Sequence, residues 1–267
     1  MDNKVEFVLI CGTGRCGTNI VKEVFSVHSS IITLPFEQRF INDPDGIIDF
    51  YNSFSASWSP YIADRKIKRL EALLRRMSYQ SPFESVAGSI VGRLDGQGKY
   101  LSLPKYHGWK LDDWFPNFSK YTGWLLSELV EFTYSGSWVG TESYQFKPKI
   151  VFSGHRRKED LARIFHDFIR KCFGDLLAKN DAEVFMDDST WSIIHAKDIL
   201  SILPTAKFIH IVRDPRDVIS SFLCQRWCPS DLADAASFYE SLISRSLETQ
   251  EQLSPDNFLM IRFEDFI

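Results

Sequence analysis

The sequence predicts an α/β fold built on a central parallel β-sheet flanked by helices. Two strand–turn–helix units lie near opposite ends of the chain, one opening with the apolar run at residues 5–11 and the other with the run at 207–212. Residues 257–263 and 184–186 form two more candidate strands. Continuous apolar strands that feed helices are typical of parallel sheets buried on both faces. We therefore expect these strands to lie side by side and in parallel.

The composition is that of a globular protein able to bury a full core. Of 267 residues, 44% are hydrophobic and 25% charged, which excludes a disordered or low-complexity chain. The formal net charge of −4 gives no overall positive field, so we expect no nucleic-acid partner, and any bound anion needs a local site. Five cysteines without a Cys-x-x-Cys pair predict neither a disulfide framework nor a metal site. We expect no transmembrane segment and a cytoplasmic protein.

We expect a single domain over residues 1–267 that carries a long inserted cap segment at about 43–150. Tryptophans in this segment are scattered among Gly, Ser, Pro and Tyr residues, unlike the regular ends of the chain. The predicted helix at 62–77 carries six basic side chains, which fits either a solvated face or a site for an anionic acceptor. Apolar residues at helical spacing from Leu161 to Leu176 predict a long amphipathic helix packed in a core.

A glycine-rich loop, GTGRCGTN at residues 12–19, joins the first strand to the first helix. Backbone amides at such a helix start favour a phosphate or sulfate. The Gly-x4-Gly spacing matches the Walker loop, but Thr18 and Asn19 replace its Lys and Ser or Thr. The cation lies within the loop instead, at Arg15. A tight turn with a surface arginine explains the loop equally well, so a second anion site is needed to decide.

A second candidate anion site lies in FIHIVRDPRDVISSF at residues 208–222. Arg213 ends the strand and Ser221 follows eight residues later in the helix. A planar fork of donors and a hydroxyl suit a phosphate held at the carboxyl end of the strand. The alternative is that Arg213 pairs with Asp214 or Asp217 at the helix start.

Taken together, these motifs resemble those of sulfotransferases that use 3′-phosphoadenosine 5′-phosphosulfate (PAPS). GTGRCGTN is similar to the 5′-phosphosulfate loop of the family, FIHIVRDPRDVISSF to its 3′-phosphate strand and helix, and Arg-Phe-Glu-Asp at 262–265 to its Arg-Tyr-Glu-Asp segment. The resemblance is closer to the bacterial and tyrosylprotein-type branches than to the cytosolic branch. It implies a P-loop-like sulfotransferase fold and an enzyme that transfers the sulfuryl group from PAPS to a hydroxyl of a carbohydrate, lipid or small molecule, without a metal.

The resemblance also assigns roles to individual residues. Arg213 and Ser221 would bind the 3′-phosphate, and Arg15 would also stabilise charge on the bridging oxygen and the moving sulfuryl group. The residues expected around the 5′-phosphosulfate are Gly14, Arg15, Cys16, Gly17, Thr18 and Asn19.

The candidate general base is Glu37. It lies 22 residues beyond Arg15, after a helix and a predicted second strand, which is similar to the spacing of the catalytic glutamate in the bacterial and tyrosylprotein-type branches. Arg39 could hold its carboxylate in place. A surface loop carboxylate explains Glu37 equally well. His107 is an alternative base, in a segment weakly similar to the Lys-Thr-His of the cytosolic branch.

The sequence departs from the family pattern in four places. Residues 188–191 stand where many bacterial members have Lys-Thr-Pro, so no role beyond a helix start is carried over there. Asn19 replaces a threonine, which alters one phosphate contact. Ile20 leaves no tryptophan of the cytosolic type to stack on adenine. The sequence stops at Ile267, before the family's closing helix and loop, so we expect either a short protein or an incomplete nucleotide clamp.

Two other functions remain open at this point. A P-loop small-molecule kinase fits the loop, although the sequence lacks the Walker lysine and an obvious magnesium carboxylate. A catalytically silent nucleotide-binding protein fits the short C-terminus. If the chain is a transferase, its acceptor needs walls, and we expect residues 43–150 to form an aromatic-lined pocket with the glycine-rich loop, opening onto Glu37.

Overall fold

The computed structural model describes residues 5–78, 106, 109–139 and 148–267. Backbone contacts divide the chain into two compact units. Unit 1 comprises Met1–Asn42 and Leu177–Ile267, and unit 2 comprises Asp43–Leu176. Unit 2 thus takes in most of the long helix that follows the stretch from 43 to 150.

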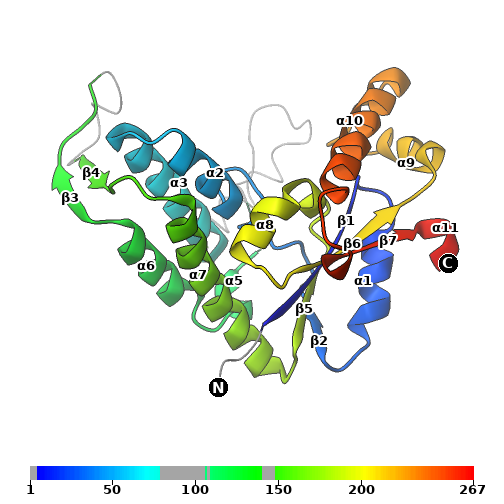
Figure 1. The fold of residues 1–267 in the computed structure, drawn as a ribbon, viewed down its shortest axis with the longest axis horizontal. Coiled ribbons are helices and arrows are strands. Elements are labelled where there is room, and N and C mark those ends of the chain that lie inside the picture. Colours follow the sequence, from blue (N-terminus) through cyan, green and yellow to red (C-terminus); the bar gives the residue numbers. More distant parts are fainter. Residues whose placement is uncertain (1–4, 79–105, 107–108, 140–147) are drawn as a thin grey trace, which may run out of the picture. The chain divides into compact units, whose positions relative to one another are not determined.

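Unit 1 is built on a five-stranded, all-parallel sheet with the strand order β2-β5-β1-β6-β7, as Figure 1 shows. The predicted α/β fold with a central parallel sheet flanked by helices is confirmed. The strands are β1 (Glu6–Gly12), β2 (Ile31–Thr33), β5 (Val184–Asp187), β6 (Lys207–Val212) and β7 (Phe258–Arg262).

The carboxyl ends of these parallel strands meet at one edge of the sheet, and this edge carries the predicted site residues. β1 is the central strand: its Leu9 lies opposite Asp187 of β5, and its Gly12 lies opposite Ile211 of β6. The glycine-rich loop, the Glu37 segment and Arg213 all follow strand ends at this edge. In open α/β sheets, ligands bind in this position.

The helices of unit 1 flank the sheet and begin at recognisable caps. Asp214 caps α9 by accepting a hydrogen bond from the backbone N–H of Arg216, and Pro215 occupies the first turn. Asp231 caps α10 in the same way. The helices are α1 (Thr18–Ser26), α8 (Ala196–Ile202), α9 (Pro215–Phe222), α10 (Leu232–Gln250) and α11 (Phe263–Phe266), with short 3-10 turns η1 (Ser192–His195) and η2 (Pro255–Asn257).

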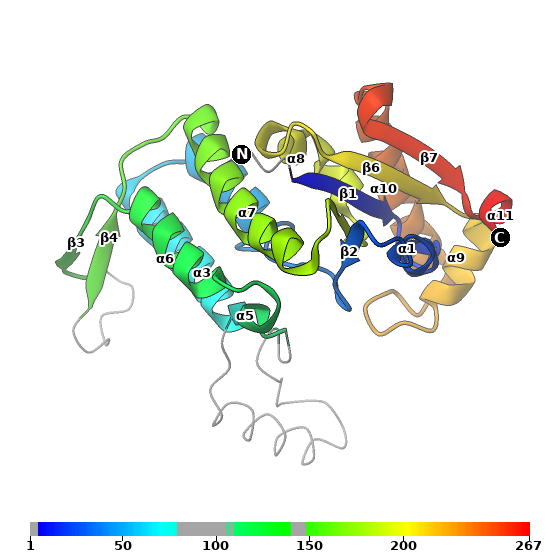
Figure 2. The same ribbon diagram turned by 90° about the horizontal axis from the view of Figure 1, so that it is seen from below.

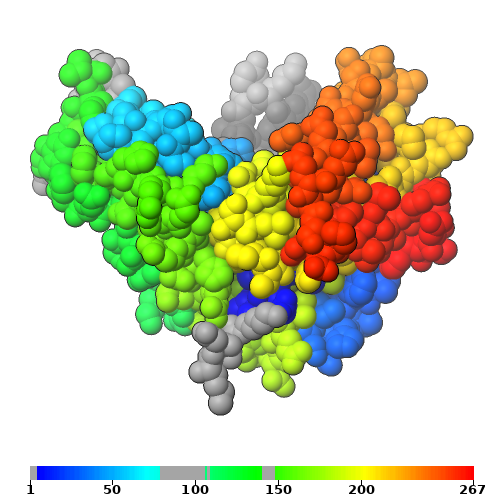
Figure 3. Space-filling model, viewed as in Figure 1, coloured from blue at the N-terminus to red at the C-terminus, as the bar shows by residue number. Residues whose placement is uncertain are grey.

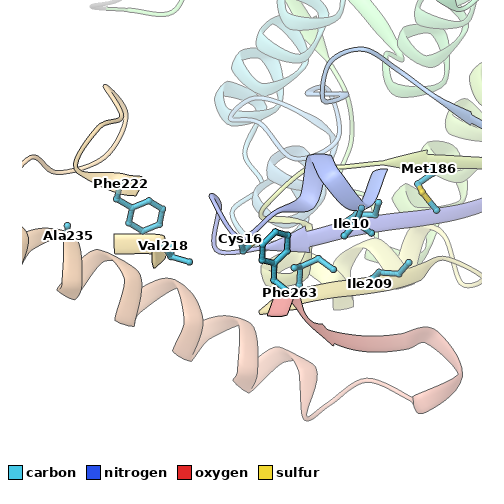
Figure 4. Close-up of a cluster of buried hydrophobic side chains, with 10 residues drawn as sticks. Ile10, Cys16, Met186, Ile209, Val218, Phe222, Ala235 and Phe263 are labelled. Atoms are coloured by element: carbon cyan, nitrogen blue, oxygen red, sulfur yellow. The ribbon is translucent and has the colours of Figure 1, made fainter. Parts of the chain in front are cut away.

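A buried apolar cluster lies directly beneath the strand ends of unit 1. Figure 4 shows Phe222 and Val218 at one end of this cluster, Met186 and Ile209 at the other, and Phe263 beside Cys16 between them. The space-filling view shows α10, β7 and α11 gathered in orange and red on one face (Figure 3). β7 is an edge strand whose Leu259 side chain is exposed.

Unit 2 is mainly helical, with a two-stranded antiparallel ribbon (Figure 2). Helix α3 includes all residues of the predicted basic helix, and α7 includes those of the predicted amphipathic helix, whose apolar side chains are buried. Several basic side chains of α3 pair with carboxylates of their own unit, among them Lys66 with Asp49 at 2.9 Å. The elements are α2 (Ile47–Ala56), α3 (Pro60–Ser78), α5 (Leu111–Trp114), α6 (Phe118–Leu129), β3 (Phe132–Ser135), β4 (Lys149–Phe152) and α7 (Lys158–Asn180), whose last turn belongs to unit 1.

None of the helices in the part of the chain that the structure describes combines the length and the apolar character needed to cross a membrane.

Candidate active site

The loop between β1 and α1 turns through left-handed backbone conformations. Gly14, Arg15 and Gly17 have φ angles of 90°, 57° and 100°. Gly17 caps α1 without a side-chain hydrogen bond to the first-turn amides, so protein side chains leave the cap position open. Successive backbone amides in such a turn, at the positive end of a helix dipole, form a concave anion site. The loop conformation therefore fits a phosphate or sulfate group.

The two predicted anion sites meet in the structure. The Arg15 Nε donates a hydrogen bond to Ser221 Oγ at 2.8 Å, and Arg213 donates through Nη1 to the backbone carbonyl of Arg15 at 3.3 Å. These contacts join the first strand–turn–helix unit to the second. Arg15, Arg213 and Ser221, which come from motifs near opposite ends of the sequence, thus form one constellation at the edge of the sheet.

Arg213 also forms an ion pair with Asp217, one of the two acidic partners expected if the arginine has only a structural role at the helix start. Its Nη2 lies 3.1 Å from Asp217 Oδ2, whereas Asp214 pairs with Arg216. The Nε of Arg213 is buried and has no hydrogen-bond partner in the described part of the chain. A buried donor without a partner costs free energy. The Arg213 side chain is nevertheless 28% exposed, so an anion can reach the guanidinium through its outer nitrogens. The ion pair and a phosphate site are therefore compatible.

The Arg-Phe-Glu-Asp segment at 262–265 contacts both the glycine-rich loop and the residues that follow β6. The Phe263 ring packs under Gly17, and the Arg213 guanidinium carbon lies 4.9 Å from the centre of that ring. The carboxylate of Glu264 accepts a hydrogen bond from the backbone N–H of Asp214 at 2.8 Å. This acceptance lowers the pKa of Glu264. The segment thus fixes both the start of α1 and the end of β6.

Glu37 lies in the loop after β2, at the same edge of the sheet. Its Oε1 accepts a hydrogen bond from Thr190 Oγ1 at 3.3 Å, and its Oε2 pairs with Arg39 at 3.0 Å. The Glu37 side chain is 27% exposed, so a ligand can reach it. Thr190 also connects Glu37 to the glycine-rich loop, because its carbonyl accepts from the Gly12 N–H at 2.8 Å.

Three residues near the loop were not predicted from the sequence. Thr190 bridges the loop and Glu37. Trp191 donates through Nε1 to the Thr13 carbonyl at 3.4 Å, and the Trp227 ring packs on Gly14. Both indoles are exposed, at 40% and 48%, and their ring centres are 6.0 Å apart. The sequence could have indicated Thr190 and Trp191 by their position, because residues 188–191 directly follow β5, whose carboxyl end lies at the same edge of the sheet as the site.

The alternative base His107 lies outside the described residues. Within the described ranges, no group of three or more His, Cys, Asp or Glu side chains is arranged to hold a metal ion.

Comparison with known proteins identifies the family. The sulfotransferase family matches residues 112–267, which is more than half of the chain. The chain belongs to the sulfotransferase family. It is therefore a transferase of the sulfotransferase class. The matched range includes Arg213, Ser221 and the Arg-Phe-Glu-Asp segment, and it begins after the glycine-rich loop and Glu37.

The other comparisons are with curated proteins and with solved structures. No curated protein matches the sequence. Among solved structures, the chain is similar to the sulfotransferase domain from the curacin biosynthetic pathway, with 16% sequence identity and a TM-score of 0.42. That similarity covers 99% of this chain and 69% of the other. The roles of individual residues in this sulfotransferase remain predictions.

Proposed function

We propose that this sulfotransferase transfers the sulfuryl group of PAPS to a hydroxyl group of an acceptor. The observation that carries the proposal is the contact between the two anion motifs, the Arg15–Ser221 hydrogen bond at 2.8 Å. A donor with phosphate groups on both the 5′ and the 3′ side of one ribose needs two anion sites close together, and these residues supply them.

The residues present fit such a donor. Gly14, Arg15 and Gly17 have positive φ angles, which are typical of backbone loops that bind anions, and the Arg213 side chain, 28% exposed, lies beside this loop. In this arrangement Arg213 and Ser221 bind the 3′-phosphate. Gly14, Cys16, Gly17, Thr18 and Asn19 surround the 5′-phosphosulfate, together with Arg15.

Catalysis then requires a base for the acceptor and a cation for the leaving group. Bound PAPS supplies an activated sulfuryl group, which moves when the acceptor oxygen bonds to sulfur and the sulfur–oxygen bond to the 5′-phosphate breaks. Glu37 takes the acceptor proton, and Arg15 stabilises the charge that develops on the bridging oxygen. The ion pair with Arg39 and the hydrogen bond from Thr190 orient the Glu37 carboxylate.

We further propose that residues 43–150 bind the acceptor, a carbohydrate, lipid or small molecule. Support comes from exposed aromatic side chains of this segment, which include Phe132 and Tyr134 on β3, 53% and 45% exposed. Flat rings stack on sugar faces or hold apolar acceptors.

A small-molecule kinase with a P-loop receives less support. The two carboxylates at the end of β5, Asp187 and Asp188, are engaged by protein donors, with Lys22 paired to Asp188 at 2.9 Å. In the kinase mechanism such carboxylates hold the magnesium ion.

The donor assignment is tested by ligand-induced thermal stabilisation. We expect adenosine 3′,5′-bisphosphate to raise Tm more than AMP does, because only the bisphosphate occupies both anion sites. Arg213→Ala should remove most of this difference. Arg216→Ala is the matched control, since Arg216 is exposed and pairs with Asp214 outside the constellation, and this variant should keep the preference. Equal shifts by the two nucleotides on the wild-type protein would refute the 3′-phosphate site.

A further inference from the structure

A buried carboxylate lies beneath the loop that carries Glu37. Asp187 ends β5 and is 1% exposed. Its Oδ1 accepts from the Gln38 backbone N–H at 3.2 Å, and its Oδ2 accepts from the Ser189 N–H at 3.2 Å and from the Ser189 hydroxyl. A buried carboxylate with three donors is a fixed point of the structure, because each donor loses a partner if it moves.

A buried ion pair lies next to this carboxylate. Lys22 of α1 places its Nζ 2.9 Å from Asp188 Oδ1, and both side chains are less than a tenth exposed, at 8% and 4%. The same Nζ donates to the Leu34 carbonyl at 3.2 Å. A lysine is rarely buried without a partner, and breaking a buried pair is strongly destabilising. Lys22 therefore ties the helix that starts at the glycine-rich loop to the segment after β2.

The two attachments hold the Glu37 segment at both of its ends. Lys22 binds the carbonyl of Leu34, and Asp187 binds the amide of Gln38, so Glu37 lies between two fixed main-chain groups. Its side chain is then directed by Thr190, which follows the same strand as Asp187. All of these contacts are independent of the acceptor.

We propose that Asp187, together with the Lys22–Asp188 ion pair, forms a positioning network that sets Glu37 at the correct place relative to the glycine-rich loop. This inference rests on the proposed function, because it takes Glu37 as the base. Asp187 acts through Glu37 and does not itself touch the acceptor.

The network also couples the charge of Asp187 to that of Glu37. The pKa of Asp187 is raised to about 7, mainly by burial and to a smaller extent by the charges on Asp188 and Glu37, against the hydrogen bonds from Ser189 and Gln38, which lower it. The charged groups around Asp187 are Lys22 from α1, Asp188 from the end of β5, and Glu37 with its partner Arg39 from the segment after β2. Asp187 is protonated below about pH 7, so its charge acts on Glu37 only as the pH rises through that value, and Asp187→Asn should remove the resulting change in kcat near pH 7.

The test is a double-mutant cycle on the full chain with PAPS as donor. Asp187→Asn removes the charge and turns one accepting oxygen into a donor that faces the Ser189 N–H. We expect kcat to fall by about 10-fold to 100-fold while the affinity for adenosine 3′,5′-bisphosphate stays within about twofold. In the Glu37→Gln background, Asp187→Asn should cause little further loss, because residues that act as a unit are not additive.

Asp64→Asn is the matched control. Asp64 of unit 2 is also fully buried and also has three donors, the Val151 N–H, the Trp138 Nε1 and the Lys68 Nζ. Asp64 is 0% exposed and cannot contact an acceptor, so this variant should lower Tm but leave the pH profile of kcat in place. Ser189→Ala removes only one donor to Asp187, so it carries the test if Asp187→Asn does not fold, and it should lower kcat in the same direction.

The outcomes separate the two hypotheses. The positioning network would be overturned if Asp187→Asn kept the wild-type kcat and pH profile, or if Ser189→Ala did so where it replaces that variant. It would also be overturned if the loss in Asp187→Asn added fully to the loss in Glu37→Gln. Wild-type transfer in Glu37→Gln, or no transfer from PAPS by the wild-type protein, would instead overturn the proposed function.

Discussion

Gly17 is the position where the structure makes the sharpest prediction about the loop. Its φ is 100°, and a Cβ added there would lie 2.3 Å from one carbon of the Phe263 ring and 2.5 Å from the next. The ring cannot turn away freely, because Phe263 is 6% exposed within the apolar cluster and supports the Arg213 guanidinium. A left-handed backbone costs a non-glycine residue about 1–2 kcal/mol, and overpacking a core adds about 1–3 kcal/mol. Gly17→Ala should therefore destabilise unit 1 by about 3 kcal/mol.

The measurement is urea unfolding at 25 °C, followed by circular dichroism and by binding of adenosine 3′,5′-bisphosphate. Gly123→Ala is the matched control: Gly123 lies in α6, and an added Cβ meets no atom within 4 Å. Alanine is favoured over glycine inside a helix, so this control should be stabilised by about 0.5–1 kcal/mol. If Gly17→Ala lies within about 0.5 kcal/mol of the wild type, the close contact with Phe263 does not constrain the loop and the reasoning fails.

Two further predictions concern carboxylates at the site. Glu37→Gln should keep the affinity for adenosine 3′,5′-bisphosphate but reduce the rate of sulfuryl transfer by about 100-fold to 10,000-fold in steady-state kinetics. Glu23→Gln, on the exposed face of α1, is the control and should leave the transfer rate unchanged. A wild-type rate in Glu37→Gln would mean that another residue is the base. Asp187 holds its proton in the folded protein up to a pH of about 7, against an ordinary value of 3.8, so its ionisation opposes folding as the pH rises. Relative to Asp187→Asn, the wild type should lose about 3 kcal/mol of unfolding free energy between pH 4 and pH 7. Parallel urea titrations at several pH values measure this difference, and identical pH dependence of the two proteins would contradict the raised pKa.

The parallel sheet could be predicted from the sequence because the central strands of the sheet are buried on both faces. Residues 5–11 and 207–212 are mainly apolar runs, interrupted only by Glu6, Lys207 and His210, and each is followed by a turn with Gly or Pro. These local signals do not depend on distant contacts. The anion motifs were also local, since a glycine-rich turn and an arginine at a strand end can be recognised from neighbouring residues alone. The structure places Arg15, Arg213 and Ser221 together.

The supporting contacts could not be predicted in the same way. Lys22 occupies a position on an amphipathic helix where a lysine normally faces solvent, and its burial depends on Asp188, far along the sequence. Asp187 follows an apolar strand and has the appearance of an ordinary turn residue. Trp227 lies in a loop, and its packing on Gly14 depends on how α9 ends. A sequence without aligned relatives carries no signal for such pairs.

The route by which this sheet assembles follows from its strand order. β1 leaves the ribosome before the other strands of the sheet, but its partners are distant: Glu6 pairs with Val184, and Val8 pairs with Lys207. Long-range pairing of this kind slows folding, because the entropy of closing large loops is lost before the contacts form. The glycine-rich loop gains its floor only when Phe263 arrives beneath Gly17. During synthesis, the glycine-rich loop is made before the residues that support it. If the proposed donor site is correct, binding of adenosine 3′,5′-bisphosphate begins only after β7 and α11 have been added.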